Sequence, residues 1–326
     1  MRSIVRAAAT AIVACLAAGL GSGPAASAYP ERPIRLLVSF PPGGSSDAMA
    51  RIVQPGLERL LGQPVVIENR AGAGGMIAID AVAKSAPDGY LLGLGGAGAL
   101  GTNLALQEKM SYDPRKDVAP VTGLAGSPFI LAAAPSFKGS SLRDVLAQAK
   151  GAPDKLAIGH GGSGTLMHLT AELFNQMAGT KVALVPYRGI APVVTDLVGG
   201  HLALGIIDPP SGMAAMESAK IKPIAISSAQ RFPRLADIPT VAESGLPGFE
   251  SNGWFGIVVP AGTPADVIAT LNSAFVTVLR DPAVIERIRA LGAEPMPMTP
   301  QDYAAFINRE IEKWLKVVAA SGGRPN

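Results

Sequence analysis

Two glycine-rich turns hold most of the residues in this sequence that could bind a ligand. The first reads Phe-Pro-Pro-Gly-Gly-Ser-Ser-Asp over residues 40–47, and the second reads Gly-His-Gly-Gly-Ser-Gly-Thr over residues 159–165. Each follows a strand-like apolar run and leads into a helix. Such a turn presents unpaired backbone N–H groups and the positive end of the helix dipole, which together suit an anion. The pair therefore predicts one anionic ligand held by two helix starts.

The residues of the two turns supply both backbone and hydroxyl donors. Glycine permits close approach of the backbone, and serine and threonine hydroxyls can donate to a carboxylate. Asp47 is placed to cap its helix and need not touch the ligand. Either turn alone is equally compatible with a purely structural role, so the hypothesis depends on their conjunction. The candidate residues from the two turns are Pro41, Gly43, Gly44, Ser45, Ser46, Asp47, His160, Gly162, Ser163, Gly164 and Thr165.

Further candidates follow other predicted strands at their carboxyl ends, where open α/β sheets bind ligands. Arg188 could make a charge-assisted contact to a carboxylate, or be an ordinary surface arginine. Asp208 could receive an amine or a hydroxyl, or be an ordinary turn residue. Trp254 is as compatible with hinge packing as with ligand contact. The remaining predicted wall residues are Ala97, Gly98 and Ser211.

Several familiar motifs are matched only in part. Residues 93–98 satisfy G-x-G-x-x-G, but they follow the third predicted strand and no acidic residue is placed for a ribose, so a ligand-lining loop fits better than a dinucleotide site. The second turn has no lysine after its last glycine, which argues against a phosphate loop. It is not a nucleophile elbow, because Thr165 stands where that motif requires glycine.

Catalysis and cofactor binding receive no positive signal. The acidic residues are scattered rather than clustered, which argues against a metal site. Of the three histidines, His160 and His168 lie around the second turn and His201 begins a strand; a structural role is the simpler interpretation for a lone histidine. We expect no cofactor and no enzymatic activity. An exported hydrolase that uses Ser45, Ser46 or Ser163 is the alternative.

The first 28 residues have the pattern of a secretory signal peptide. Arg2 and Arg6 precede the apolar stretch 7–20, and Ala26-Ser27-Ala28 is a cleavage site of the A-x-A type. The apolar stretch is short for a membrane span, and no later segment reaches about 20 uninterrupted apolar residues. We expect an exported, soluble, periplasmic protein cleaved near Ala28. The alternative is that residues 12–15 form a lipid-attachment box.

Composition narrows the class further. The chain has 326 residues, 48% of them hydrophobic and 16% charged, which predicts about two well-packed domains. Its one cysteine is Cys15, in the leader, so the mature chain would have no disulfide, zinc–thiolate site or cysteine nucleophile. The leader holds two of the 28 basic residues and none of the 25 acidic ones, so the net charge falls from +3 to +1. Nothing in this pattern calls for nucleic acid.

Strands and helices alternate along the chain, which indicates parallel sheets with helical crossovers. The apolar run 118–134 is predicted to cross into a second lobe, and the run 254–260 to return. We therefore predict an α/β protein of two lobes, each a mainly parallel sheet flanked by helices, joined by two crossing strands that form a hinge. The expected divisions are residues 29–128 with 252–326 for lobe 1 and 129–251 for lobe 2.

Many short segments, in order, resemble one known family. They cover essentially the whole mature chain and are Tyr29-Pro30, Arg32-Pro33-Ile34, residues 40–44, 62–70, 72–75, 86–90, 112–114, 185–189, 238–243 and 260–264. In these segments the chain resembles the substrate-binding proteins of tripartite tricarboxylate transporters, the Bug (Bordetella uptake gene) family.

The resemblance implies a periplasmic binding protein of a type II-like fold. It would close on a small organic carboxylate and deliver it to membrane transporter subunits, and we expect it to act as a monomer. By this resemblance, loops 41–47 and 161–165 grip a carboxylate partly through ordered water, and loops at Ala97-Gly98 and 208–211 line the rest. The chain departs from the family pattern at His160-Gly161, at 95–98 and at 207–210. Because of these departures, the resemblance does not predict which carboxylate is the ligand. A ligand-binding sensor partner of a membrane receptor kinase is an alternative role.

Overall fold

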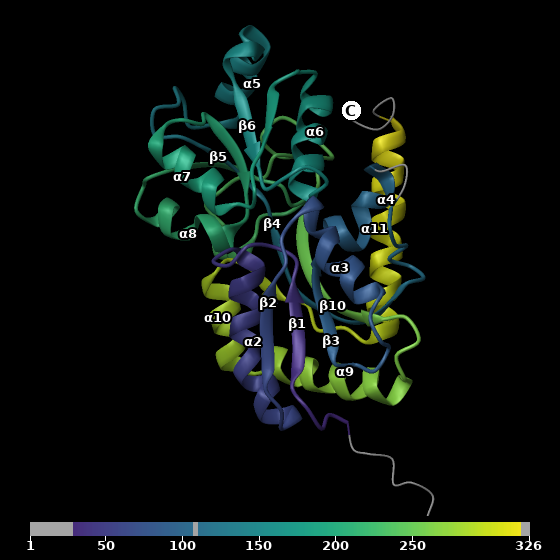
Figure 1. Ribbon diagram of the computed structural model, residues 1–326. Coiled ribbons are helices and arrows are strands. Elements are labelled where there is room, and N and C mark those ends of the chain that lie inside the picture. The colour runs from purple at the N-terminus through teal and green to yellow at the C-terminus, as the bar shows by residue number, and fades with distance from the viewer. Residues whose placement is uncertain (1–28, 107–109, 321–326) are drawn as a thin grey trace, which may run out of the picture.

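The computed structural model describes residues 29–106 and 110–320, and the predicted signal peptide and lipid box lie outside them. The chain forms two lobes, each built around one sheet (Figure 1). The first sheet has the strand order β11-β4-β10-β3-β1-β2, and the second has the order β7-β6-β8-β5-β9. The strands are β1 (Ile34–Val38), β2 (Val65–Asn69), β3 (Leu91–Gly96), β4 (Val118–Pro128), β5 (Ile130–Ala133), β6 (Ala157–His160), β7 (Ala183–Pro186), β8 (Leu204–Ile207), β9 (Lys222–Ile226), β10 (Asn252–Pro260) and β11 (Glu294–Pro295).

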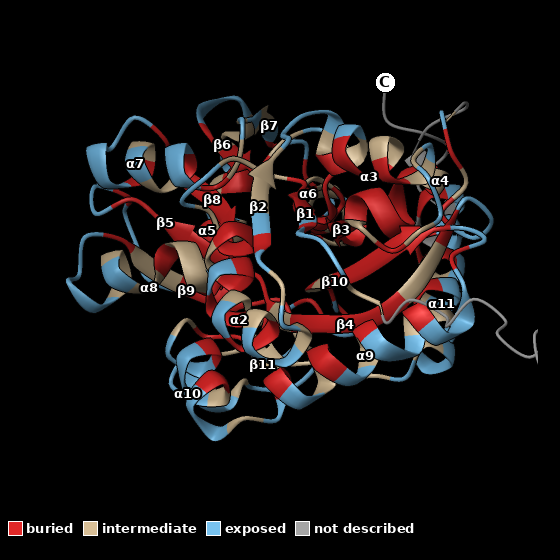
Figure 2. Ribbon diagram, turned by 60° about the horizontal axis from the view of Figure 1, so that its bottom comes forward, coloured by how far each residue is buried: buried red, intermediate tan, exposed pale blue. Residues whose placement is uncertain are grey.

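Helices cover both faces of the first sheet, because its strands alternate between two apolar faces. In β1, Ile34, Leu36 and Val38 pack with one cluster of helices, whereas Leu37 packs on the opposite side. The burial pattern places both sets of side chains inside the protein (Figure 2). The α-helices are α2 (Ser45–Leu61), α3 (Met76–Ala83), α4 (Asn103–Leu106), α5 (Leu142–Gly151), α6 (Leu166–Ala178), α7 (Ala191–Gly199), α8 (Pro209–Glu217), α9 (Ala265–Leu279), α10 (Pro282–Ala290) and α11 (Pro300–Ala320).

Helix α2 illustrates how local sequence sets these elements. Its buried positions recur at three- and four-residue spacing, including Met49, Val53 and Leu57. The helix ends at Gly62, whose φ of 67° is a left-handed conformation that glycine adopts without steric cost. The start of α2 is left at the edge of the sheet where β1 ends, facing the other lobe (Figure 1).

Two long strands connect the lobes, as predicted. Strand β4 runs out of the first sheet, and β10 returns antiparallel beside it, with Asn252 paired to Pro128 and Pro260 paired to Val118. The two chain crossings are fixed by a buried hydroxyl: Ser227 donates to the carbonyl of Ser251 and accepts from the N–H of Phe129. These contacts tie the two crossings to each other, so the connection is ordered rather than a loose linker.

The predicted fold class is confirmed, with one difference in the sheets. Both sheets are mixed: β1 pairs parallel with β2 and β3, whereas β10 pairs antiparallel with β3 and β4. The antiparallel pairs arise because the chain leaves and returns between the lobes. The residue boundaries of the lobes stay a prediction. Within the described residues no single helix is long and apolar enough to cross a membrane, although the bent pair α9 and α10 passes by length and composition.

Candidate functional site

A cavity of about 110 Å³ lies between the two lobes. Most of its lining is apolar, with a few polar groups, which is typical of small-molecule sites. Both predicted turns contribute to it, as do both strands that cross between the lobes. The lining residues are Phe40, Pro41, Pro42, Gly44, Ser45, Gly96, Ala97, Gly98, Ser127, Phe129, Gly161, Thr165, Leu166, Met167, Arg188, Gly189, Ile190, Ala191, Pro192, Asp208, Gly253, Trp254 and Phe255.

The first turn leaves the start of α2 open to this cavity. Gly44 is the N-cap residue of α2 and provides no side-chain acceptor for the first N–H groups of the helix. No described group accepts a hydrogen bond from the N–H of Ser45 or Ser46, and the Ser46 hydroxyl is buried without a partner. Unpaired donors at a helix N-terminus favour a negatively charged partner. The start of α2 therefore has the capacity to bind an anion.

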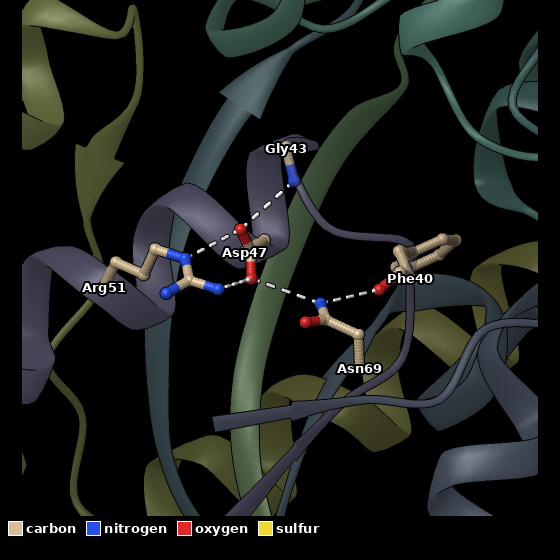
Figure 3. Close-up of polar contacts among 5 residues, drawn as sticks. All are labelled: Phe40, Gly43, Asp47, Arg51 and Asn69. Carbon is tan, nitrogen blue, oxygen red and sulfur yellow. Dashed lines mark hydrogen bonds and ion pairs between the residues drawn. The ribbon is translucent and has the colours of Figure 1, made fainter. Parts of the chain in front are cut away.

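Asp47 does not line the cavity, and its side chain supports the first turn (Figure 3). Its carboxylate accepts hydrogen bonds from the N–H of Gly43 at 3.1 Å, from Arg51 at 2.9 and 3.1 Å, and from Asn69 at 3.2 Å. Asn69 also donates to the carbonyl of Phe40, so both ends of the turn are tied to β2. Burial acts to raise the pKa of Asp47, but the hydrogen bonds from Arg51, Gly43 and Asn69 outweigh it and hold the pKa below its usual value.

The second turn is shaped around the start of α6. Thr165 caps the helix: its hydroxyl donates to the carbonyl of Gly162 at 2.7 Å and accepts from the N–H of His168 at 3.3 Å. Gly162 and Gly164 have φ values of 127° and 77°, conformations that strain any residue with a Cβ. The N–H groups of Leu166 and Met167 have no described acceptor, and both residues line the cavity. The start of α6 is thus a second potential anion site, on the opposite lobe from α2.

Two stacked histidines lie behind the second turn. The rings of His160 and His168 are 4.8 Å apart, and His160 is 1% exposed. Nδ1 of His160 donates to the carbonyl of Gly162, and Nδ1 of His168 accepts from the N–H of Gly164, at 3.2 and 3.5 Å. Burial, and the neighbouring His168, lower the pKa of His160 to about 4. His160 therefore supports the turn as a neutral ring and does not line the cavity.

The buried His160 predicts a loss of stability in acid. Its pKa falls from 6.5 to about 4 on folding, so protons bind the unfolded chain first as the pH drops below 6.5. The free energy of unfolding should fall by about 3 kcal/mol between pH 6.5 and pH 4 from this residue. Urea unfolding at several pH values should show a shallower decline for His160→Gln. Identical pH profiles for the two proteins would contradict this assignment.

The start of α8 differs from those of α2 and α6. Its first two residues, Pro209 and Pro210, have no N–H, and the N–H of Ser211 already donates to Oδ1 of Asp208 at 3.1 Å. Asp208 is 2% exposed and lines the cavity. Burial raises the pKa of Asp208, against the opposing effects of Ser45 and Ser211. This wall presents an acidic acceptor where the other two helix starts present donors.

Arg188 and Trp254 occupy different parts of the site. Arg188 is exposed at the rim, and its guanidinium forms no ion pair within the described part of the chain. Trp254 lies on the returning strand β10 and lines the cavity, but its Nε1–H points to Glu310 on α11, at 3.3 Å. Its ring meets Phe306 edge to face at 5.1 Å. Trp254 thus forms part of the cavity wall and also packs against α11.

The predicted residues fall into three groups. Nine line the cavity between the lobes: Pro41, Gly44, Ser45, Ala97, Gly98, Thr165, Arg188, Asp208 and Trp254. Gly162 and Ser163 line a neighbouring hollow of about 590 Å³, which shares the first turn and Arg188 with the cavity. The other six line neither of these hollows: Gly43, Ser46, Asp47, His160, Gly164 and Ser211.

The two lobes touch directly where glycines face each other. A Cβ added at Gly98 would lie 2.7 Å from the carbonyl oxygen of Gly164 in the other lobe. A Cβ at Gly74 would lie 3.0 Å from the carbonyl carbon of Gly164. Backbone atoms cannot yield at such distances, so these glycines permit the close approach of the lobes. The structure therefore has its two lobes in direct contact beside the cavity.

The sequence analysis did not predict some of the residues that line the cavity and the neighbouring hollow. The loop 71–75 faces the second turn across the neighbouring hollow, and its run of glycines was the available signal. Phe129, Met167 and the segment 190–192 also line the cavity, as apolar wall. Their positions depend on how the lobes close, which no local pattern reveals. Among the described residues no group of three or more potential ligands is placed to hold a metal ion.

Comparison with known proteins identifies the family. Residues 49–322 match the model of the tripartite tricarboxylate transporter family receptor. The chain belongs to this family. As a member, it is similar to protein BugT of Bordetella pertussis, with 39% identity over 94% of each chain. The solved structure of Rhodopseudomonas palustris Rpa4515 with adipate has a TM-score of 0.88 at 36% identity, covering 91% of this chain and 100% of that one. That of MatC from the same organism with bound malate has a TM-score of 0.84 at 33% identity, covering 89% and 99%.

These comparisons confirm the family that was predicted from the sequence. The resemblance to Bug proteins is confirmed by BugT and by the solved periplasmic binding protein BugD, which has a TM-score of 0.87 at 32% identity over 91% of this chain and 100% of that one. The family consists of solute-binding receptors, and nothing in the comparisons indicates catalysis.

Proposed function

We propose that this protein is a periplasmic, non-catalytic receptor that captures a small organic carboxylate between its lobes and passes it to the membrane subunits of a tripartite transporter. One observation supports the proposal: residues at the starts of α2 and α6, whose first N–H groups have no acceptor among the described residues, line a single cavity from opposite lobes. A carboxylate bound there would bridge the lobes, so its binding energy would favour the closed form.

The sequence and the relatives support the remaining parts. Similar receptors of known structure hold adipate and malate, both of which are carboxylates. The leader predicts export with cleavage near Ala28, and we propose that the mature chain acts as a monomer without a cofactor. Arg188 at the rim adds a positive charge near the entrance, which would attract an anion.

The proposal is tested by binding measurements on protein freed of any prebound ligand by unfolding and refolding. Isothermal titration calorimetry with adipate, malate, succinate, aspartate and benzoate should give saturable binding by at least one acid, at a ratio of one per chain. The diamide adipamide, the neutral counterpart of adipate, serves as the control and should not bind. Absence of binding by every acid, in refolded protein with a normal unfolding transition, would contradict the proposal.

A further inference from the structure

Asp208 is an unusual group to find in a cavity for an anion. Among the described residues that line the cavity it is the one with an acidic side chain, and it is 2% exposed. A ligand carboxylate placed against it would bring two negative charges together in a water-poor space, which is strongly unfavourable. The carboxylate end of a ligand is therefore expected to pair with the open N–H groups at the helix starts and not with Asp208, whose carboxylate already interacts with the Ser45 hydroxyl at the start of α2.

The donors around Asp208 already interact with its own carboxylate, so few of them remain for a ligand carboxylate. Pro209 and Pro210 have no N–H, and the N–H of Ser211 is taken by Asp208 itself. The Ser45 and Ser211 hydroxyls also form hydrogen bonds with this carboxylate and so oppose the effect of burial on its pKa.

A buried carboxylate side chain that lines a ligand cavity favours a ligand group that donates a hydrogen bond to it. We propose that Asp208 accepts a hydrogen bond from a hydroxyl or an ammonium group of the bound molecule, so that the receptor selects carboxylates that carry such a donor. A purely apolar acid would leave Asp208 buried and unpaired with any ligand group, and would bind more weakly. This inference rests on the proposed function and names the class of carboxylate.

The test compares matched acids by isothermal titration calorimetry on the refolded protein. Succinate, L-malate and L-aspartate share a skeleton and carry no donor, a hydroxyl and an ammonium group respectively; benzoate and 4-hydroxybenzoate form a second pair. In at least one set, we expect the substituted acid to bind roughly 10-fold or more tighter than the unsubstituted one. Malate or 4-hydroxybenzoate would identify a hydroxyl, and aspartate an ammonium group.

Two variants tie this preference to Asp208. Asp208→Asn and Asp208→Ser both retain an N-cap side chain for α8, so each should fold, and the thermal midpoint without ligand checks this. In both variants the preference for the substituted acid should fall by roughly fivefold or more, since a charged acceptor makes the stronger hydrogen bond. Asp154→Asn, an exposed change in the same lobe, should leave the preference unchanged.

The possible failures can be told apart. If the wild-type protein binds succinate or benzoate as tightly as every substituted partner, the role of Asp208 is wrong while carboxylate binding stands. The same conclusion follows if both Asp208 variants keep the wild-type preference. If adipate binds and none of these probes does, the role of Asp208 is wrong, because adipate carries no such donor, while carboxylate binding stands. If neither adipate nor any of these probes binds, the proposed function fails, and this inference fails with it.

Discussion

Replacing Gly98 with alanine is expected to weaken carboxylate binding by roughly 10- to 100-fold, although each lobe remains folded. The new Cβ would lie 2.7 Å from the carbonyl oxygen of Gly164 and 3.4 Å from Cα of Thr165 in the opposite lobe, and 3.0 Å from the carbonyl oxygen of Gly74 in its own lobe. The φ of Gly98 is not in the left-handed region, so alanine adds no backbone strain there. The contact with Gly74 requires a small shift within the loop 71–75. The closer contact with Gly164 is relieved by parting the lobes, which separates the two helix starts.

Gly101→Ala is the matched control, because it lies in the same short helical turn. Its Cβ would meet Trp254 at 3.7 Å and Ile311 at 3.8 Å, which are ordinary contacts. Calorimetry should show near wild-type affinity for Gly101→Ala, and small-angle scattering should show ligand-induced compaction in it but not in Gly98→Ala. Wild-type affinity and compaction in Gly98→Ala would refute the role of this glycine in closure.

Gly256→Ala should destabilise the protein by about 3 kcal/mol or more. Gly256 lies on the returning strand β10, and a Cβ there would sit far inside the van der Waals radius of the Tyr303 hydroxyl and ring. Tyr303 is 0% exposed and packs beside Trp254, so its ring has little room to move. The strain would fall on the contact between the hinge strand and α11.

Urea unfolding followed by tryptophan fluorescence should show a lower midpoint for Gly256→Ala. Gly151→Ala, at the end of α5, is the control: a Cβ there meets nothing within 4 Å, and alanine favours helix, so its midpoint should not fall. An unchanged midpoint for Gly256→Ala would mean that Tyr303 repacks readily and that the hinge is less tightly packed than described.

The sequence was sufficient for the class of fold and for the two turns. Strands alternating with helices predict α/β lobes, and glycine turns before helices predict open N–H groups, because both signals are local. The direction of strand pairing was harder to predict. That β10 runs antiparallel between β3 and β4 follows from the return of the chain between the lobes, which short segments do not encode.

The roles of single residues in the site depend on contacts across long separations. Asp47 and His160 lie within the predicted turns, yet both face away from the cavity because Arg51, Asn69 and His168 hold them. Gly98 and Gly164 belong to different lobes, so their contact depends on how the lobes pack together. Proximity in sequence could mark the region of the site, but tertiary packing decides which side chains reach a ligand.

A crystal structure of the protein with its tightest-binding carboxylate would test the central claim most directly. We predict that one carboxylate group lies in the cavity between the lobes, within about 2.7–3.2 Å of N–H groups at the starts of both α2 and α6, or linked to them by one water. A ligand bound outside this cavity, or held only by side chains while both helix starts stay unoccupied, would contradict the account.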